Sequence, residues 1–449
     1  MDKNFIWGAG TSAYQIEGAF NEDGRSPSIW DTFSHTPGKI ERKHTGDVAC
    51  DHYHRYKEDV KLLAELGVKA YRFSISWSRI LPNGIGEINE KGLAFYDHLL
   101  DELSQYHIEP FVTLYHWDLP QILFEKGGWL NPQIPSWFEY YVDVVTKHFG
   151  KRVRNYITIN EPQIVVQVGM HSLEHAPGII YSTRECLQAS HHILLAHGLA
   201  VRKIRKNVPD ALIGFAPCSD SVVPLHNDPA SVEEARKLFF QLRKDNFHVV
   251  TLFSDPVFLG DYPKEYYEMY KDVLPKMGKD DLKIISTPID YCYQNVYTGA
   301  YCDVDASGKG YIKDFPVGSP QSNIVWEDVV PETNYWTPKF LYERYHKPIF
   351  IGENGMCCHD AVSKDGKVHD PNRVDFMDRY LTELKKVQKD GIPVVGYFAW
   401  SLLDNFEWAW GYTKRFGIVY VDFTTQKRIQ KDSYYFYRET IKNQGENLR

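Results

Sequence analysis

Eight short apolar runs, many of them separated by helical patterns, recur along the whole chain of 449 residues. Most of these runs are continuous rather than alternating, which is typical of strands buried on both faces of a parallel sheet. The repeated alternation of strand and helix predicts an α/β fold, a single (β/α)8 TIM barrel with one domain over residues 1–449. A doubly wound sheet is the alternative architecture. The predicted strands are Asn4–Ala9, Ala70–Trp77, Pro110–His116, Tyr156–Asn160, Leu212–Ala216, Tyr291–Val296, Pro348–Gly352 and Val394–Trp400.

The segments between the runs fit this architecture. Val60, Leu63 and Leu66 share one face of a predicted helix that ends at Gly67. The chain is longer than the ~250 residues usual for such a barrel. We therefore expect extended loops above the C-terminal ends of the strands, and Tyr301–Thr337, rich in Gly, Pro and Asp, is one such insertion.

Two of the predicted strands end in a glutamate. Glu161 follows Tyr156–Ile159 and Glu353 follows Pro348–Ile351. All strands of a parallel barrel end at one face, where active-site groups collect, so the two carboxyl groups are expected to meet there. Paired carboxyl groups indicate a glycoside hydrolase, in which one protonates the leaving oxygen and the other faces the anomeric carbon. A separation of about 5–5.5 Å gives retention of configuration and about 6.5–9.5 Å gives inversion.

Two further residues suggest how the carboxyl groups would differ. Arg72 on a neighbouring strand and Tyr297 would hold one carboxylate ionised as the nucleophile, and that anion would raise the pKa of the other carboxyl group. Esterification of the nucleophile removes its charge, so the acid can then serve as a base. The alternative for Arg72 is a purely structural ion pair, because an interior arginine needs a partner.

Polar and aromatic residues also gather at the predicted strand ends. Aromatic residues form 14% of the chain, with 11 Trp and 30 Tyr, and flat rings with a polar edge suit the binding of sugars. A large aromatic core is the alternative explanation of this composition.

Several longer motifs resemble those of a known family. The chain resembles glycoside hydrolase family 1, the retaining β-glucosidases, over nearly its full length and with the motifs in the family's order and spacing. These motifs are Phe5–Gly8, Thr11–Gly18, Tyr71–Trp77, Leu114–Asp118, Thr158–Pro162, Ile351–Gly355, Asp404–Trp408 and Lys414–Gly417.

The resemblance implies Glu161 as acid and base and Glu353 as nucleophile. It implies hydrolysis of terminal non-reducing β-D-glucosyl residues from cellobiose, short cello-oligosaccharides and aryl glucosides, with side activity on β-galactosides or fucosides. Departures from the family pattern are Gly352, where Thr is usual, Val296 and Gln163. The implied substrate-binding residues are Gln15, His116, Trp117, Asn160, Asn295, Tyr297, Trp326, Trp400, Glu407, Trp408 and Phe416.

Two rival functions are weighed against this one. Relatives that act on 6-phospho-β-glucosides carry a Ser near position 407 with a Lys and a Tyr downstream, whereas this chain has Glu407, Lys414 and Phe416. A carboxylate at 407 would repel a phosphate and would accept hydrogen bonds from free sugar hydroxyls. The second rival, a non-catalytic sugar-binding barrel, usually lacks one of the two glutamates, and both are present here.

Charge and cysteine usage predict the remaining properties. The net charge of −8 without a basic stripe argues against nucleic acid, and no apolar run approaches the ~18 residues of a membrane span. Asn4–Trp7 is already strand-like, which leaves no room for a secretory segment, and seven scattered Cys suit reduced thiols. We expect a cytoplasmic protein with a small-molecule β-glycoside as its partner; a homo-oligomer is compatible with the family.

Two clusters have alternative interpretations. His191, His192 and His197 lack the i, i+4 spacing of a helical zinc pair, so we expect packed or solvated histidines, no metal and no cofactor. The adjacent Cys357 and Cys358 follow the second glutamate closely, and redox sensing there is the weaker alternative to plain thiols.

Overall fold

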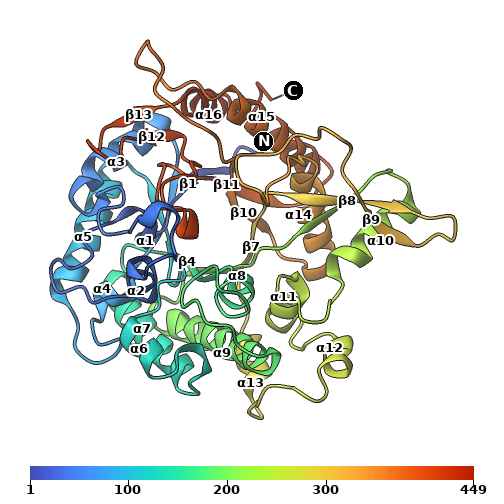
Figure 1. Ribbon diagram of the computed structural model, residues 1–449, viewed down its shortest axis with the longest axis horizontal. Coiled ribbons are helices and arrows are strands. Elements are labelled where there is room, and N and C mark those ends of the chain that lie inside the picture. Colours follow the sequence, from blue (N-terminus) through green and yellow to red (C-terminus); the bar gives the residue numbers. More distant parts are fainter. Residues whose placement is uncertain (449) are drawn as a thin grey trace.

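Eight parallel strands close into a barrel in the computed structural model, which describes residues 1–448 (Figure 1). The hydrogen-bonded order β1-β11-β10-β7-β5-β4-β3-β2 follows the chain around the barrel, so the predicted (β/α)8 architecture is confirmed. Each predicted strand overlaps one barrel strand. The barrel strands are β1 (Ile6–Gly10), β2 (Ala70–Ser74), β3 (Glu109–Thr113), β4 (Asn155–Asn160), β5 (Leu212–Ala216), β7 (Tyr291–Asn295), β10 (Ile349–Asn354) and β11 (Val394–Trp400).

Helices surround the barrel (Figure 1). The helix of His52–Leu66 ends where predicted, because Gly67 has a φ of 85° and its N–H is bonded to Leu63 O and Ala64 O, both at 3.1 Å. Within residues 1–448 no helix has the length and apolar character that a membrane crossing requires. The α-helices are α1 (Ala13–Ile16), α2 (Ile29–His35), α3 (His52–Leu66), α4 (Trp77–Ile80), α5 (Glu90–Gln105), α6 (Gln121–Glu125), α7 (Ile134–Phe149), α8 (Pro162–Gln167), α9 (Thr183–Asn207), α10 (Pro229–Phe240), α11 (Val250–Phe258), α12 (Lys264–Met269), α13 (Asp281–Ile285), α14 (Thr333–Tyr345), α15 (Pro371–Lys389) and α16 (Asp432–Lys442).

The interior of the barrel is filled at its floor by a separate apolar cluster. Tyr293 and Phe350 stack with ring centroids 4.8 Å apart, and Phe111 meets Phe398 edge-on at 5.1 Å. Burying one such ring contributes about 1.5–3 kcal/mol to stability. The outward side chains of the strands join the larger core beneath the helices. The buried members of the floor cluster are Ala70, Phe111, Ile157, Ala216, Tyr293, Phe350 and Phe398.

The insertion predicted at Tyr301–Thr337 contains regular structure. Strands β8 (Gly299–Val304) and β9 (Gly310–Lys313) form an antiparallel hairpin, and β8 also pairs in parallel with β6 (Ser221–Pro224). The hairpin projects beyond the ring of helices at the right of Figure 1. A second small sheet pairs β12 (Val419–Val421) with β13 (Arg428–Gln430). The Gly, Pro and Asp content of the insertion therefore predicted its turns but not its two short strands.

Candidate active site

A cavity of about 350 Å³ opens at the C-terminal ends of the barrel strands. Both sequence-predicted carboxylates and nine of the predicted sugar-binding residues line it. Gln15, Arg72 and Asn160 lie directly behind this lining and bond to it. The predicted residues among those that line the cavity are His116, Trp117, Glu161, Asn295, Tyr297, Trp326, Glu353, Trp400, Glu407, Trp408 and Phe416.

Glu353 is held from both sides by hydrogen-bond donors. Arg72 Nη1 donates to Glu353 Oε1 at 2.6 Å, and Tyr297 OH donates to Glu353 Oε2 at 2.8 Å. The second guanidinium nitrogen of Arg72 donates to Asn160 Oδ1 at 2.5 Å, which fixes the plane of the arginine. A buried carboxylate paired with an arginine and a phenol is stabilised in its ionised form.

Glu161 has a different and uncharged partner. Asn295 Nδ2 donates to Glu161 Oε1 at 2.7 Å and to Asn160 Oδ1 at 3.1 Å, so one amide links the two strand ends. The backbone of Glu161 has a φ of 41° and a ψ of 65°, and its N–H donates to Ala216 O at 2.7 Å. Left-handed conformations are uncommon for residues with a side chain and cost about 1–3 kcal/mol. Surrounding contacts therefore force the acid candidate into position.

Both glutamate-bearing strands lose their regular pairing just before the glutamate. The register of β4 with β5 shifts between Ile157 and Asn160, and the register of β10 with β7 shifts between Ile351 and Glu353. Side chains alternate between the two faces of a regular strand, so an extra residue changes which side chain points inward. Phe350 and Glu353 are an odd number of residues apart, so in a regular strand their side chains would point to opposite faces. The shift in β10 lets both point into the barrel, Phe350 into the floor cluster and Glu353 into the cavity.

The environment separates the protonation behaviour of the two carboxyl groups. Burial, together with the nearby Glu353 carboxylate, raises the pKa of Glu161 to about 8. Burial also raises the pKa of Glu353, but Arg72 and Tyr297 oppose that rise, so Glu353 loses its proton first. At neutral pH this pair thus holds one anionic carboxyl group, Glu353, and one protonated carboxyl group, Glu161.

A third carboxyl group lies on the opposite wall. Gln15 Nε2 donates to Glu407 Oε2 at 3.3 Å and to Asn405 Oδ1 at 3.0 Å, while Ser12 Oγ donates to Gln15 Oε1 at 2.6 Å. Burial, with the Glu353 carboxylate nearby, raises the pKa of Glu407 to about 8. This wall presents the Glu407 carboxyl group, with the Gln15 amide bonded directly behind it.

Aromatic rings form the rest of this part of the cavity. His116 lies parallel to Trp400 at 5.8 Å and to Trp408 at 6.0 Å, and Trp117 packs on Trp408 at 4.5 Å. Burial lowers the pKa of His116 well below its ordinary value, so this ring is neutral. Trp117 and Trp408 have φ values of 77° and 47°, which places both in the left-handed region alongside Glu161.

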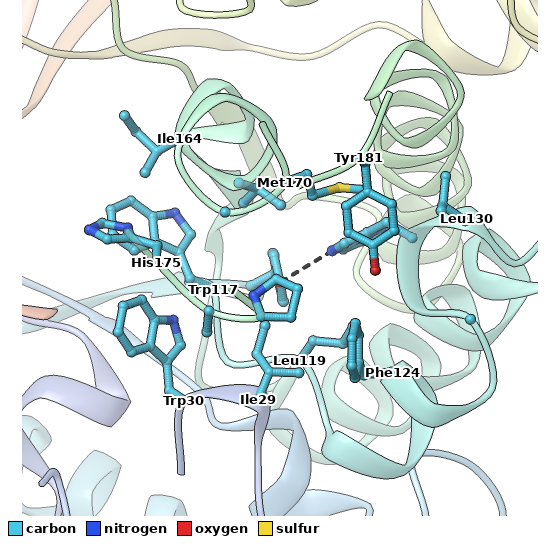
Figure 2. A pocket seen from close by; sticks show the side chains of 17 residues that line it. Ile29, Trp30, Trp117, Leu119, Phe124, Leu130, Ile164, Met170, His175 and Tyr181 are labelled. Carbon is cyan, nitrogen blue, oxygen red and sulfur yellow. Dashed lines mark hydrogen bonds between the residues drawn. The ribbon is translucent and has the colours of Figure 1, made fainter. Parts of the chain in front are cut away.

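A small apolar chamber lies behind Trp117 (Figure 2). Its volume is about 30 Å³, and Trp117, His175 and Ile164 line both this chamber and the main cavity. Figure 2 shows Trp30, Leu119 and Phe124 on the far side from Met170 and Ile164. The indole of Trp117, whose Nε1 donates to Asn160 O at 3.1 Å, is thus a partition between two spaces.

The entrance is formed partly by the inserted segment. Trp326 lies parallel to Phe416 at 6.2 Å and meets Tyr297 edge-on at 5.6 Å. The neighbouring Glu327 is buried and accepts the N–H of Cys357 at 3.0 Å through Oε2. Burial raises the pKa of Glu327 to about 8. Trp326, at the loosest part of the motif pattern, is therefore anchored next to the strand end that carries Glu353.

Sequence reasoning missed one polar part of the lining. Cys218 and Asp220 follow β5 directly, so the strand-end rule used elsewhere would have found them, but no motif marks this strand. His248 precedes α11 and had no sequence signal. The other lining residues that were not predicted are Ile164, Gln167, Val168, Glu174, His175, Ser219, Thr298 and Trp410.

The histidines of α9 bond to neighbouring groups. His191 contacts Tyr262 OH at 3.0 Å and Asp281 Oδ2 at 2.9 Å, and His192 donates to Trp129 O at 2.8 Å. In the part of the chain that the structure describes, no group of three or more His, Cys, Asp or Glu side chains is arranged to hold a metal ion.

Three comparisons relate this chain to known proteins. The sequence model of Glycosyl hydrolase family 1 matches residues 1–446. Beta-glucosidase A of Thermotoga maritima is 46% identical over 99% of this chain and 98% of its own length. The 1,4-beta-D-glucan glucohydrolase of Thermotoga neapolitana is 44% identical, again over 99% and 98%. A solved structure of the Thermotoga maritima beta-glucosidase in complex with glucoimidazole has a TM-score of 0.90 and 45% identity, covering 99% of both chains.

Proposed function

The chain belongs to glycosyl hydrolase family 1 and is a β-glucosidase, and we propose that Glu353 is its nucleophile and Glu161 its acid and base. It releases terminal non-reducing β-D-glucosyl residues with retention of configuration. The observation that carries the assignment of roles is the asymmetry of the two carboxyl groups. Glu353 accepts from a guanidinium and a phenol, whereas Glu161 accepts from a neutral amide.

In the first step, Glu353 attacks the anomeric carbon as the glycosidic bond breaks. Glu161 transfers its proton to the departing oxygen, because an alkoxide is a poor leaving group. The pKa of about 8 keeps Glu161 protonated at neutral pH, which suits this task. The products of this step are a covalent glucosyl-enzyme and the free aglycone.

In the second step, the roles of the carboxyl groups change. Glu353 is now an ester and carries no charge, so its repulsion, which adds to the effect of burial in raising the pKa of Glu161, is gone. Glu161 then accepts a proton from water, the water oxygen bonds to the anomeric carbon, and Glu353 leaves as a carboxylate. The second inversion restores the β configuration.

The glycone pocket follows from the opposite wall. We assign Trp400 as the platform under the sugar ring, and Gln15 and Glu407 as partners for the hydroxyls far from the anomeric carbon. His116 and Asn160 would bind the remaining hydroxyls, as the neutral His116 ring can donate or accept. Such a pair of amide and carboxyl groups can bond to either epimer at C4, which supports side activity on β-galactosides and fucosides.

The rival 6-phosphoglucosidase function lacks a suitable cation. Among the described residues that line the cavity there is no lysine or arginine. Lys414, the residue that matches the phosphate-binding pattern, donates instead to Asn323 O at 2.6 Å and lies 5.2 Å from the Trp410 ring. A phosphate held next to Glu407 would have no positive partner, so the proposal is an unphosphorylated sugar.

Cellobiose and short cello-oligosaccharides are the proposed natural substrates, which places the enzyme at the last step of cellulose degradation. We propose a cytoplasmic location, which is supported by seven cysteines that are all free and mostly buried. Residues 1–449 are proposed to work as one domain, because strands from both ends of the chain complete the same barrel.

Trapping the covalent intermediate tests the assignment. In a 2-deoxy-2-fluoro-β-glucoside the fluorine slows both steps, and a dinitrophenyl leaving group restores the rate of the first step only. The glycosyl-enzyme therefore accumulates, and peptide mass spectrometry locates the residue that carries the sugar. We expect the label on Glu353, and NMR of p-nitrophenyl β-glucoside hydrolysis is expected to show β-glucose first. A label on Glu161, or α-glucose as the first product, would overturn the proposal. Faster hydrolysis of p-nitrophenyl glucoside 6-phosphate than of the plain glucoside would support the rival function.

A further inference from the structure

A thiol, an imidazole and a carboxylate form a chain of contacts on the cavity wall that the reaction above does not use. His248 Nε2 lies 3.2 Å from Cys218 Sγ, and His248 Nδ1 lies 3.2 Å from Asp220 Oδ1. All three residues line the same cavity as Glu161 and Glu353. The order of the groups resembles that of a nucleophilic triad, but burial raises the pKa of the Cys218 thiol well above its ordinary value, so Cys218 stays protonated.

Backbone contacts tie this cluster to the acid and base. Cys218 pairs with Asn295 in a parallel bridge, and Asn295 is the residue whose amide donates to Glu161 at 2.7 Å. The N–H of Glu161 itself donates to Ala216 O, two residues before Cys218. Gln163, the second residue of α8, accepts the N–H of Cys218 at 3.3 Å through its side-chain oxygen. Movement of the cluster relative to Glu161 is restricted by these bonds.

The charges around Glu161 are mostly negative. The guanidinium of Arg72 is committed to Glu353 and Asn160. Burial acts to raise the pKa of Asp220, but the contact with His248 and the charge of Arg243 outweigh it and leave that pKa lowered. The titratable groups that face Glu161 and His248 from the neighbouring elements are Arg72, His116, Glu174, His175, Cys218, Asp220, Arg243, Tyr297, Glu353 and Glu407.

Three histidines line the cavity, and they differ in the direction in which their pKa is shifted. Burial lowers the pKa of His116 well below its ordinary value and that of His175 to about 3, so both rings are neutral. Burial also acts to lower the pKa of His248, but the bond to Asp220 and the nearby Glu161 carboxylate outweigh it and leave the pKa raised. His248 is therefore the histidine of this cavity that carries a proton most readily.

Resting on the roles assigned above, we propose that His248, held by Asp220, is a positioning residue for the acid and base. Its imidazolium stabilises the carboxylate form of Glu161, the form that must accept a proton from water in the second step. Without this cation Glu161 holds its proton more tightly. The first step then keeps its rate up to a higher pH, because Glu161 stays protonated there. The second step slows near neutral pH, because less of Glu161 is in the carboxylate form.

The two steps are measured separately by the choice of leaving group. Cellobiose requires protonation by Glu161, so the alkaline limb of kcat/KM reports the pKa of Glu161 in the free enzyme. A 2,4-dinitrophenyl glucoside leaves without that proton, so its kcat reports the second step. For His248→Gln we expect the alkaline limb for cellobiose to move upward by roughly half to one pH unit. The kcat for the dinitrophenyl substrate at pH 6 is expected to fall by roughly threefold to tenfold, the same shift expressed as a rate.

Two variants and one control complete the test. His248→Lys keeps a cation and is expected to restore most of the wild-type profile. Asp220→Asn is expected to move the limb upward as well, because it acts through His248; direct loss of a negative charge next to Glu161 would move it downward. His148→Gln removes another histidine–carboxylate pair, His148 with Asp97 at 2.8 Å on the surface, and should change nothing.

An alkaline limb that stays in place in His248→Gln would overturn the inference, as would a His248→Lys profile equal to that of His248→Gln. A downward shift in Asp220→Asn would contradict the role of Asp220. Labelling of Glu353 by the fluoroglucoside is followed in every variant. Wild-type enzyme that is not labelled at Glu353 refutes the proposed function, whereas normal labelling with an unmoved limb refutes only the role of His248.

Discussion

At the floor of the barrel the strands turn aromatic and aliphatic side chains inward, and at the mouth the same strands turn carboxyl, amide and guanidinium groups inward. Strand β10 supplies Phe350 to the floor and Glu353 to the mouth, and β7 supplies Tyr293 and Asn295 in the same way. The floor depends on filled volume, which tolerates exchange among apolar residues of similar size. The mouth depends on individual hydrogen bonds at 2.6–2.8 Å around Glu353. Stability and chemistry are thus divided along the length of each strand.

The largest effect is expected from removing either carboxyl group at the mouth. Glu353→Ala should lower kcat/KM for cellobiose on the order of 10⁴- to 10⁶-fold, since the nucleophile is lost. Glu161→Ala should lower it on the order of 10²- to 10⁴-fold, and much less for a dinitrophenyl glucoside that needs no acid. Glu90→Ala, at an exposed position of α5, is the control. A wild-type rate for cellobiose in either active-site variant would break the comparison.

At the floor, Phe398→Ala should act on stability instead. The loss of a buried ring is expected to lower the free energy of unfolding by about 3–5 kcal/mol, measured by denaturant or thermal unfolding. The kcat/KM of the folded enzyme should stay close to that of the wild type. Phe398→Leu, which keeps most of the volume, should cost less than about 1.5 kcal/mol. A large fall in activity at unchanged stability would show that the floor and the mouth are not separate.

Tyr297→Phe sharpens the comparison by removing a single hydrogen bond of the mouth. A bond to a charged group contributes about 1.5–3 kcal/mol, so kcat should fall by roughly tenfold to a hundredfold. The Tyr297 bond lowers the pKa of Glu353 against the effect of burial, so the acid limb of kcat/KM should move to higher pH. Tyr301→Phe, in the β8–β9 hairpin, removes a bond to Glu332 far from this chemistry and is the control. An unmoved acid limb would contradict the role given to Tyr297.

The smallest effect is expected at Gly352, where the floor meets the mouth. A Cβ atom there would lie 2.7 Å from Asn295 Oδ1, so Gly352→Ala must displace the amide that holds Glu161. A shift of a few tenths of an ångström should lower kcat/KM by roughly fivefold to tenfold, given that misplacement by 1 Å can cost about a hundredfold. The unfolding midpoint is measured alongside, and an unchanged kcat/KM would show that Asn295 has room to move.

Much of this architecture was readable in the sequence. The apolar runs located all eight barrel strands, because strands buried on both faces have no polar side to hide them. The ends were less accurate: the run predicted as Ala70–Trp77 stops at Ser74, and Trp77 begins α4. The sequence pattern continues there because those residues are still buried, although the ladder of hydrogen bonds has ended.

The site was readable where residues follow a strand and join a motif, as Glu161 and Glu353 do. Two features of the site could not be predicted from the sequence. The register shifts in β4 and β10 depend on pairing with neighbouring strands, which no single segment specifies. His248 reaches the cavity from a loop before α11, and only the folded chain brings it within 3.2 Å of both Cys218 and Asp220. Long-range contacts between loops leave no periodic signal.

The left-handed backbone of Trp117, Glu161 and Trp408 has a consequence for engineering. Glycine adopts this conformation without the steric penalty, so Glu161→Gly relieves strain and removes a buried carboxyl group. At Trp117 and Trp408 the loss of a buried ring, about 3–5 kcal/mol, outweighs the strain that is relieved. A library screened for heat resistance alone would therefore favour Glu161→Gly and return proteins that resist heat but no longer cleave cellobiose. Selection for both properties at once must instead look to the floor, where improvement of packing leaves these three residues untouched.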